Sequence, residues 1–243
     1  MNAHAPLAPS AAHRWICCPG SVAAARGIPE GRPSAYAEEG TRAHALFARC
    51  LLTGAAVGDL LNDCDMIAPL QRAVDAARGI IGAAPVLIEQ QLPPLPGLPD
   101  IWGTGDVVLF DAALRARGVV DLKYGVGVAV EAHAVQLAIY GVLAAYQFGV
   151  SPHGLTAWVV QPRCPHSLGP VRSHHYTPDD LARMVEELGI AAAATEQPDA
   201  PRQAGAWCRF CPARPDCAEL QGNPDAIPAI GGGGPPILTL EAW

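Results

Sequence analysis

Three short runs rich in apolar and β-branched residues follow one another in the middle of the chain, and they constrain its fold more than any other feature. The runs are VLIEQQL (86–92), WGTGDVVLF (102–110) and GVVDLKY (118–124). Proline, glycine and polar residues separate them, which is typical of consecutive strands joined by short connections. The sequence therefore predicts a β meander at the centre of the protein.

Segments with apolar residues at helical spacing lie on both sides of this meander. The predicted helices are 10–26, 34–54, about 67–81, about 131–148 and 178 to about 194, and two further predicted strands are 155–161 and 171–176. Helices thus precede the meander, and a helix, two strands and a last helix follow it. This order predicts an α/β or α+β fold in which a central mixed β-sheet is flanked by helices.

Length and composition indicate one elaborated domain over residues 1–230. With 243 residues, 50% of them hydrophobic, the chain can bury a full core. The domain is expected to contain a helical N-terminal part (11–85), the sheet core (86–176), one helix (177–198) and a cysteine-rich segment (205–220). The glycine- and proline-rich stretch that opens 231–243 predicts a flexible linker and tail.

Charge and hydropathy argue against two kinds of protein. The formal net charge of −7 disfavours a protein that holds nucleic acid by bulk electrostatics, although a local arginine-lined groove is compatible with it. The N-terminus lacks a basic start followed by an apolar run, and no segment reaches the roughly 18 apolar residues of a membrane span. We therefore expect a cytoplasmic protein without a membrane partner. In such a reducing compartment, clustered cysteines are metal ligands rather than disulfides.

A candidate active site centres on Asp121 and Lys123, which stand two residues apart in a predicted strand and so project from the same face. Lys123 is the single lysine of the chain. Asp106 lies in the preceding strand and can approach Asp121 if the two strands form a hairpin, and Glu89 lies in the strand before that. Carboxylates gathered in this way bind Mg²⁺ or Mn²⁺, which orient water and neutralise charge during phosphodiester hydrolysis. An Asp-x-Lys tripeptide alone is common, and by itself it more often marks ordinary strand-end and surface residues.

Two further motifs accompany this tripeptide. Gln136 and Tyr140 stand at i, i+4 spacing on one face of the next helix, and His44 lies in an N-terminal helix. In this combination the chain resembles the RecB-like branch of the PD-(D/E)XK nucleases, which includes CRISPR-associated exonucleases and the nuclease domains of helicase–nuclease repair complexes. Within that branch it is most similar to an uncharacterised phage- and prophage-borne member. The resemblance covers about residues 11–220 and implies a restriction-endonuclease-like core.

The resemblance assigns a role to each motif. Gly40-Thr41-Arg42-Ala43-His44 matches a helical G-T-x-x-H motif whose histidine is a metal ligand, and Gly105-Asp106 matches the motif aspartate. Asp121-Leu122-Lys123 matches the D/E-x-K motif, and the backbone carbonyl of the middle residue also faces the metal. The implied metal ligands are therefore His44, Asp106, Asp121 and Leu122.

The resemblance also implies a wider catalytic set. Gln136 and Tyr140 match a Q-x-x-x-Y motif that lies at the active site and contacts the catalytic lysine or the DNA. The acid at the position of Glu89 varies in its role across the branch, from a metal ligand to an exposed side chain. The implied catalytic residues are Asp106, Asp121, Lys123, Gln136, Tyr140 and Glu89.

A second candidate metal site is formed by Cys208, Cys211 and Cys217, which lie on a proline-interrupted stretch and need a fourth ligand. Four thiolates bind Zn²⁺ or iron, and their spacing alone does not distinguish the two. The chain also resembles the RecB-like iron–sulfur nucleases, in which three C-terminal cysteines and one near the N-terminus hold a [4Fe-4S] cluster that fastens the two ends of the fold. This resemblance implies Cys18, which precedes a Pro-Gly-Ser sequence, as the fourth ligand, with Cys17 as its rival.

Three functions fit these observations. The first is a metal-dependent DNA nuclease, an exonuclease acting on DNA ends or single strands in phage or prophage recombination and repair. The second is a catalytically silent nucleic-acid-binding accessory protein, and the third is a zinc-stabilised interaction protein. The intact set of acids and lysine favours the first. The chain has no Walker-type motif, so a helicase, polymerase or annealing protein is the expected partner.

Overall fold

The three central runs form the first three strands of a five-stranded mixed sheet in the described part of the chain, which comprises residues 5–29, 31 and 34–227 of a computed structural model. Neighbouring strands pair antiparallel, except that the third and fourth are parallel. In sheet order the strands are β1 (Val86–Leu92), β2 (Gly103–Phe110), β3 (Ala116–Leu122), β4 (Leu155–Val160) and β5 (Val171–Tyr176). The predicted mixed sheet is therefore confirmed.

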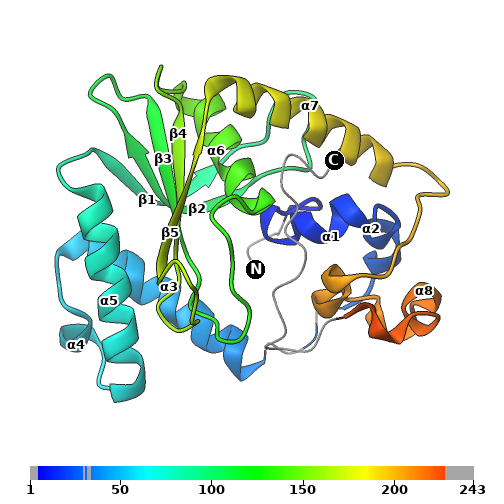
Figure 1. Cartoon of the computed structure of the whole chain (residues 1–243), viewed down its shortest axis with the longest axis horizontal. Coiled ribbons are helices and arrows are strands. Elements are labelled where there is room, and N and C mark those ends of the chain that lie inside the picture. Colours follow the sequence, from blue (N-terminus) through cyan, green and yellow to red (C-terminus); the bar gives the residue numbers. More distant parts are fainter. Residues whose placement is uncertain (1–4, 30, 32–33, 228–243) are drawn as a thin grey trace.

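Helices cover both faces of the sheet (Figure 1), and the fold is α+β as predicted. One face carries α3 (Ala35–Thr53), α4 (Val57–Leu60) and α5 (Cys64–Ile81). The other carries α1 (Ala12–Cys17), α6 (Val135–Phe148) and α7 (Pro178–Thr195). Alternate strand residues enter two separate hydrophobic cores, so that Val107 and Val120 pack under α3–α5 while Val108 and Val119 pack under α6 and α7.

Helix α6 is the crossover that allows β3 and β4 to run parallel, because parallel neighbours cannot be joined by a tight turn. Most of its residues from Val135 to Ala144 are buried. The helix begins four residues later than the predicted start near 131, because 125–134 forms a loop. Its first turn therefore starts directly beside the end of β3.

The first predicted helix, 10–26, is wrong as a single element. The structure has a 3-10 turn, η1 (Pro9–Ala11), then α1, and then a separate helix α2 (Gly20–Ala25). Pro19 has no backbone N–H and restricts the residue before it, so Cys18 leaves the helical region with φ −138°. The break places Cys18 between the two helices.

The C-terminal cysteine-rich segment is irregular, as the sequence predicts. It contains η2 (Ala206–Phe210), η3 (Arg214–Asp216), α8 (Ala218–Gln221) and η4 (Pro224–Ala226). In Figure 1 this orange segment lies beside the blue helices α1 and α2. The predicted linker and tail at 231–243 lie outside the described residues. Among the described helices, none combines the length and the apolar character needed to cross a membrane.

Gly20 stands where the two ends of the domain meet most closely. Its amide donates to the carbonyl of Pro201 at 2.9 Å, and a Cβ at this position would lie only 2.4 Å from the carbonyl oxygen of Ala200. A methyl group therefore does not fit unless one chain segment moves. Only the absence of a side chain lets the segments approach in this way.

We expect Gly20→Ala to lower the free energy of unfolding by about 1–3 kcal/mol, because overpacking against backbone atoms cannot be relieved by a rotamer change. The melting temperature should fall by about 5 °C, measured by circular dichroism. Gly79→Ala in α5 is the matched control, since a Cβ there has open space and alanine is the better helix residue. Equal melting temperatures for the two variants would contradict the close approach.

Candidate metal and phosphodiester site

Three carboxylates stand side by side on neighbouring strands. In the β1–β2 ladder Ile88 pairs with Val107 and Gln90 pairs with Gly105. Glu89 therefore lies opposite Asp106. The β2–β3 ladder ends at Val107 and Val120, so Asp106 and Asp121 are the next facing positions. The predicted hairpin therefore forms, and it aligns three acids across one end of the sheet.

His44 reaches this row from α3. Its Nδ1 lies 3.1 Å from Oδ1 of Asp106, and ligand atoms of His44, Glu89 and Asp106 all lie within 4.8 Å of one another. Adjacent ligands of an octahedral ion with bonds of about 2.1 Å stand about 3.0 Å apart. These three side chains can therefore share one cation. Within the described residues no other group of three histidines, cysteines or acids is as close.

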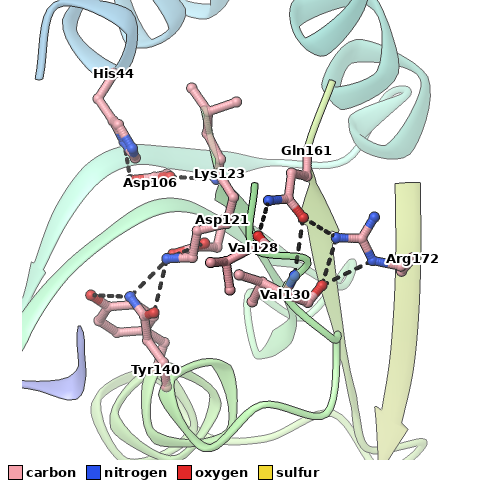
Figure 2. A network of polar contacts seen from close by, with 11 residues as sticks. His44, Asp106, Asp121, Lys123, Val128, Val130, Tyr140, Gln161 and Arg172 are labelled. Atoms are coloured by element: carbon pink, nitrogen blue, oxygen red, sulfur yellow. Dashed lines mark hydrogen bonds and ion pairs between the residues drawn. The ribbon is translucent and has the colours of Figure 1, made fainter. Parts of the chain in front are cut away.

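Asp106 is oriented by the backbone of β3 (Figure 2). Its Oδ2 accepts a hydrogen bond of 2.7 Å from the amide of Leu122, and the residue is only 8% exposed. This bond links β2 and β3 beyond the last paired residues of the ladder and fixes the orientation of the carboxylate. The other oxygen, Oδ1, faces His44. The amide of Leu122 thus positions a candidate ligand, while the predicted role of its carbonyl as a ligand stays a prediction.

Glu89 has an unusual backbone conformation for a strand residue, with φ +52°. The left-handed region is unfavourable for a residue with a Cβ, and such strain gathers at functional sites. Residues six positions apart in a regular strand point to the same face. In β1, however, Val86 packs against the core under α3–α5 and Leu92 lies in the core on the other face, so the side-chain alternation reverses between them, where Glu89 has its unusual conformation. Burial, and then the charge of Asp106, raise the pKa of Glu89, as expected of acids crowded together.

Lys123 lies beside the three-residue group and not within it. Its Nζ is 2.8 Å from Oδ2 of Asp121 and donates a 2.8 Å hydrogen bond to Oε1 of Gln136. The amide nitrogen of Gln136 lies 3.4 Å from the hydroxyl oxygen of Tyr140 and 3.5 Å from Oδ1 of Asp121. The i, i+4 pair on α6 therefore faces the Asp-x-Lys strand, and it holds the ammonium in place (Figure 2).

Burial dominates the electrostatics of this site. Desolvation raises the pKa of Asp121, although the nearby ammonium of Lys123 acts in the opposite direction. Desolvation also raises the pKa of Tyr140. For His44 burial lowers the pKa, but the hydrogen bond to Asp106 and its charge outweigh this, and the net pKa is raised. Acids held this close repel one another, and a divalent cation bound among them would relieve that repulsion.

A buried polar network that the sequence analysis missed lies next to the site (Figure 2). Arg172 of β5, only 3% exposed, donates to the carbonyl of Val130 at 2.9 and 2.6 Å and to Oε1 of Gln161 at 2.6 Å. Gln161 in turn donates to the carbonyl of Val128 at 2.8 Å. The network fixes the loop between β3 and α6. In the sequence this network is signalled only by Arg172, a charged residue at a position of β5 whose side chain points inward.

The four predicted cysteine ligands, Cys18, Cys208, Cys211 and Cys217, line one cavity where the N-terminal helices meet the C-terminal segment. Cys17 is not among its lining residues. The amide of Gln203 donates to Sγ of Cys18 at 3.3 Å. Burial raises the pKa of Cys18 and of Cys208, and Cys211 and Cys217 contribute to both shifts, so the four sulfurs influence one another.

These sulfurs are not packed as closely as the ligands of one ion. In the described chain no three of them lie within 4.8 Å of one another, whereas thiolates at about 2.3 Å from a tetrahedral Zn²⁺ stand about 3.8 Å apart. The ligands of a four-iron cluster bind different iron atoms and stand farther apart. The four sulfurs line one cavity but, in the described residues, are not gathered around the position of a single ion.

A comparison with protein families identifies the family of this chain. A family model described as "Protein of unknown function (DUF2800)" matches residues 4–229. The matched region includes the histidine of α3, the three aligned acids, the lysine and all four cysteines of the cavity. Because the match extends over most of its length, the chain belongs to the DUF2800 family.

Proposed function

We propose that this protein is a metal-dependent DNA nuclease that hydrolyses phosphodiester bonds at DNA ends or in single strands. One observation carries the proposal: ligand atoms of His44, Glu89 and Asp106 lie within 4.8 Å of one another, and the Asp121–Lys123 ion pair lies beside them. A cation site next to a fixed ammonium suits a reaction in which negative charge develops on phosphorus. The resemblance to RecB-like nucleases supports the same reading.

The donor set fits Mn²⁺ and Mg²⁺. Carboxylate oxygens suit both ions, and the imidazole of His44 favours Mn²⁺, since Mg²⁺ binds oxygen almost exclusively and keeps several waters. Asp121, the further predicted ligand, would complete the set through the carboxylate oxygen that does not pair with Lys123. When bound, the ion would lower the pKa of a water molecule and neutralise charge on the phosphate.

Lys123 is the residue that we assign to the reacting phosphate or its attacking water. Its ammonium is held between Oδ2 of Asp121 and Oε1 of Gln136, both at 2.8 Å, so its position is fixed before substrate binds. Its third N–H remains to donate toward the substrate. Gln136 is in turn oriented by Tyr140, which makes these two α6 residues positioning groups for Lys123.

We also propose that Cys18, Cys208, Cys211 and Cys217 hold a [4Fe-4S] cluster, with a structural Zn²⁺ as the alternative. All four line a single cavity, and burial there raises the pKa of the Cys18 and Cys208 thiols. Such a cluster would fasten α1 and α2 to the C-terminal segment. Its role would be structural, because the acids of the other site are carried by different elements.

The setting we propose is DNA recombination or repair of a phage or prophage, in the cytoplasm, beside a helicase, polymerase or annealing protein. The second candidate function is a catalytically silent accessory protein that binds nucleic acid. The pairing of Lys123 with the buried Asp121 and with Gln136 favours the enzyme, because a buried ion pair contributes little net stability and its presence suits a functional role.

The test compares wild type with Asp106→Asn in cleavage of end-labelled single- and double-stranded DNA by anaerobically purified protein. We expect wild type to cut with Mn²⁺ or Mg²⁺ and not with excess EDTA. Asp106→Asn should cut at least about 100-fold more slowly and bind Mn²⁺ at least about tenfold more weakly, since a neutral amide replaces a charged ligand.

Asp75→Asn in α5 is the matched control, because it removes the same charge from an exposed position. It should behave as wild type in both assays. DNA binding by wild type without any cleavage would instead support the accessory protein. Undiminished cleavage by Asp106→Asn would overturn the assignment of the metal site.

A further inference from the structure

A cavity of about 560 Å³ leads away from the candidate active site. Three parts of the chain line it: η1 with the start of α1, the loop before α6, and η2 of the C-terminal segment. Gln136 belongs to the lining and is also the residue that accepts the hydrogen bond from Lys123. The cavity and the candidate active site therefore share Gln136.

The C-terminal wall of this cavity is aromatic. Trp207 and Phe210 both line it. The indole of Trp207 is fixed, because its Nε1 donates to the carbonyl of Gln203 at 2.8 Å and its ring meets His13 edge-on at 5.5 Å between centroids. Phe210 is 81% exposed, so most of its ring surface is open to contact. Two flat rings are thus offered to an occupant of the cavity.

The charge of the lining suits an anionic chain. Arg14 and Arg209 are its cationic residues, and its single acid among the described residues, Glu131, is engaged at 2.6 Å by His166. In addition, Nε2 of His13 and Nη1 of Arg14 are buried nitrogens with no hydrogen-bond partner in the part of the chain that the structure describes. Buried polar groups are rarely left unpaired, and an occupant could bond these nitrogens once the side chains of His13 and Arg14 turn toward the cavity that they line.

The cysteine segment shapes this wall. Cys208 and Cys211 line the thiol cavity, while Arg209, Phe210 and Pro212, which alternate with them, line the other one. The same short segment thus turns its sulfurs toward one cavity and its phenyl ring and guanidinium toward the other. A group that held the sulfurs would also hold the aromatic wall in place.

We infer that this cavity binds unpaired bases of single-stranded DNA, which stack on Phe210 and Trp207 while the phosphates run past Arg14 and Arg209 toward Lys123. Aromatic rings accept any base, and arginines contact the backbone, so the subsite selects strand character and not sequence. Bases in a duplex are stacked on each other and cannot enter. The inference deepens the proposed nuclease function and rests on it for the direction of the strand.

The test measures binding of fluorescein-labelled oligothymidylate to the full chain by anisotropy in EDTA, so that no cutting occurs. The comparison strand has the same phosphates but abasic sugars. Wild type should bind the strand with bases at least about tenfold more tightly than the abasic strand, a difference that Phe210→Ala should largely remove. Phe210→Tyr, which keeps an aromatic ring, should retain it.

Ile190→Ala on α7 is the matched control, since it removes a side chain that is likewise largely exposed, at 72%, but does not line the cavity. It should bind both strands as wild type does. Equal affinity of wild type for the two strands, or an unchanged preference in Phe210→Ala, would overturn the subsite. Base-dependent binding without cleavage in Mn²⁺ would overturn the nuclease proposal but support the subsite. Cleavage together with base-independent binding would support the nuclease proposal but overturn the subsite.

Discussion

Lys123→Ala is expected to reduce DNA cleavage by at least about 1,000-fold, because a general acid–base or charge-stabilising group contributes about 10²–10⁴ to the rate. The change removes the ammonium that Asp121 and Gln136 hold at 2.8 Å. Lys123→Arg should fail as well, since a planar guanidinium cannot take the place of a compact ammonium between two fixed oxygens. The measurement is single-turnover cleavage of end-labelled DNA in Mn²⁺.

The variant also leaves Asp121, a residue that is only 4% exposed, without its partner cation. Breaking such a pair destabilises the fold, so thermal unfolding and Mn²⁺ binding must be measured beside cleavage. A folded Lys123→Ala protein that binds Mn²⁺ but does not cut assigns the loss to chemistry. Arg183→Ala on α7 removes a positive charge from an exposed ion pair and should leave cleavage unchanged. Full activity of folded Lys123→Ala would refute the mechanism.

Cys18→Ser is expected to abolish most of the iron content of anaerobically purified protein and to lower its melting temperature by about 10 °C or more. Cys18 lines the cavity shared with the three C-terminal cysteines. Its loss would release the clamp between the first helices and the last segment, which are otherwise joined by few described bonds, such as that of Gly20 with Pro201. Metal analysis and the visible absorbance of the cluster check the first effect.

Cys17→Ser is the matched control, because it changes the adjacent thiol, which does not line the cavity. It should keep its iron and lose little stability. The opposite result, with iron lost from Cys17→Ser and kept in Cys18→Ser, would show that the neighbouring residue is the ligand. A colourless protein that contains zinc and loses it in Cys18→Ser would keep the four-thiol site and replace iron by zinc.

Local sequence patterns sufficed for much of the sheet and for part of the site. Strands at 86–92 and 171–176 have the predicted bounds, because short strand-forming runs and the turn residues that flank them act over a few positions. The placement of Asp121 and Lys123 on one face, and of Gln136 and Tyr140 on one helix turn, follows from the same local geometry. That these two pairs meet depends on α6 packing beside β3, which the order of elements already indicated.

The sequence by itself determined the α+β fold, the order of its strands and the residues able to form the site, since periodicity, turns and short spacings are local properties. Only the tertiary structure decided that His44 meets Asp106, that Glu89 takes a left-handed conformation and that Cys18 faces the other thiols. Each of these depends on how distant segments pack or on a single backbone rotation. A rotation at Cys18 or Glu89 changes which side chain faces inward without changing the hydrophobic pattern from which the fold is predicted.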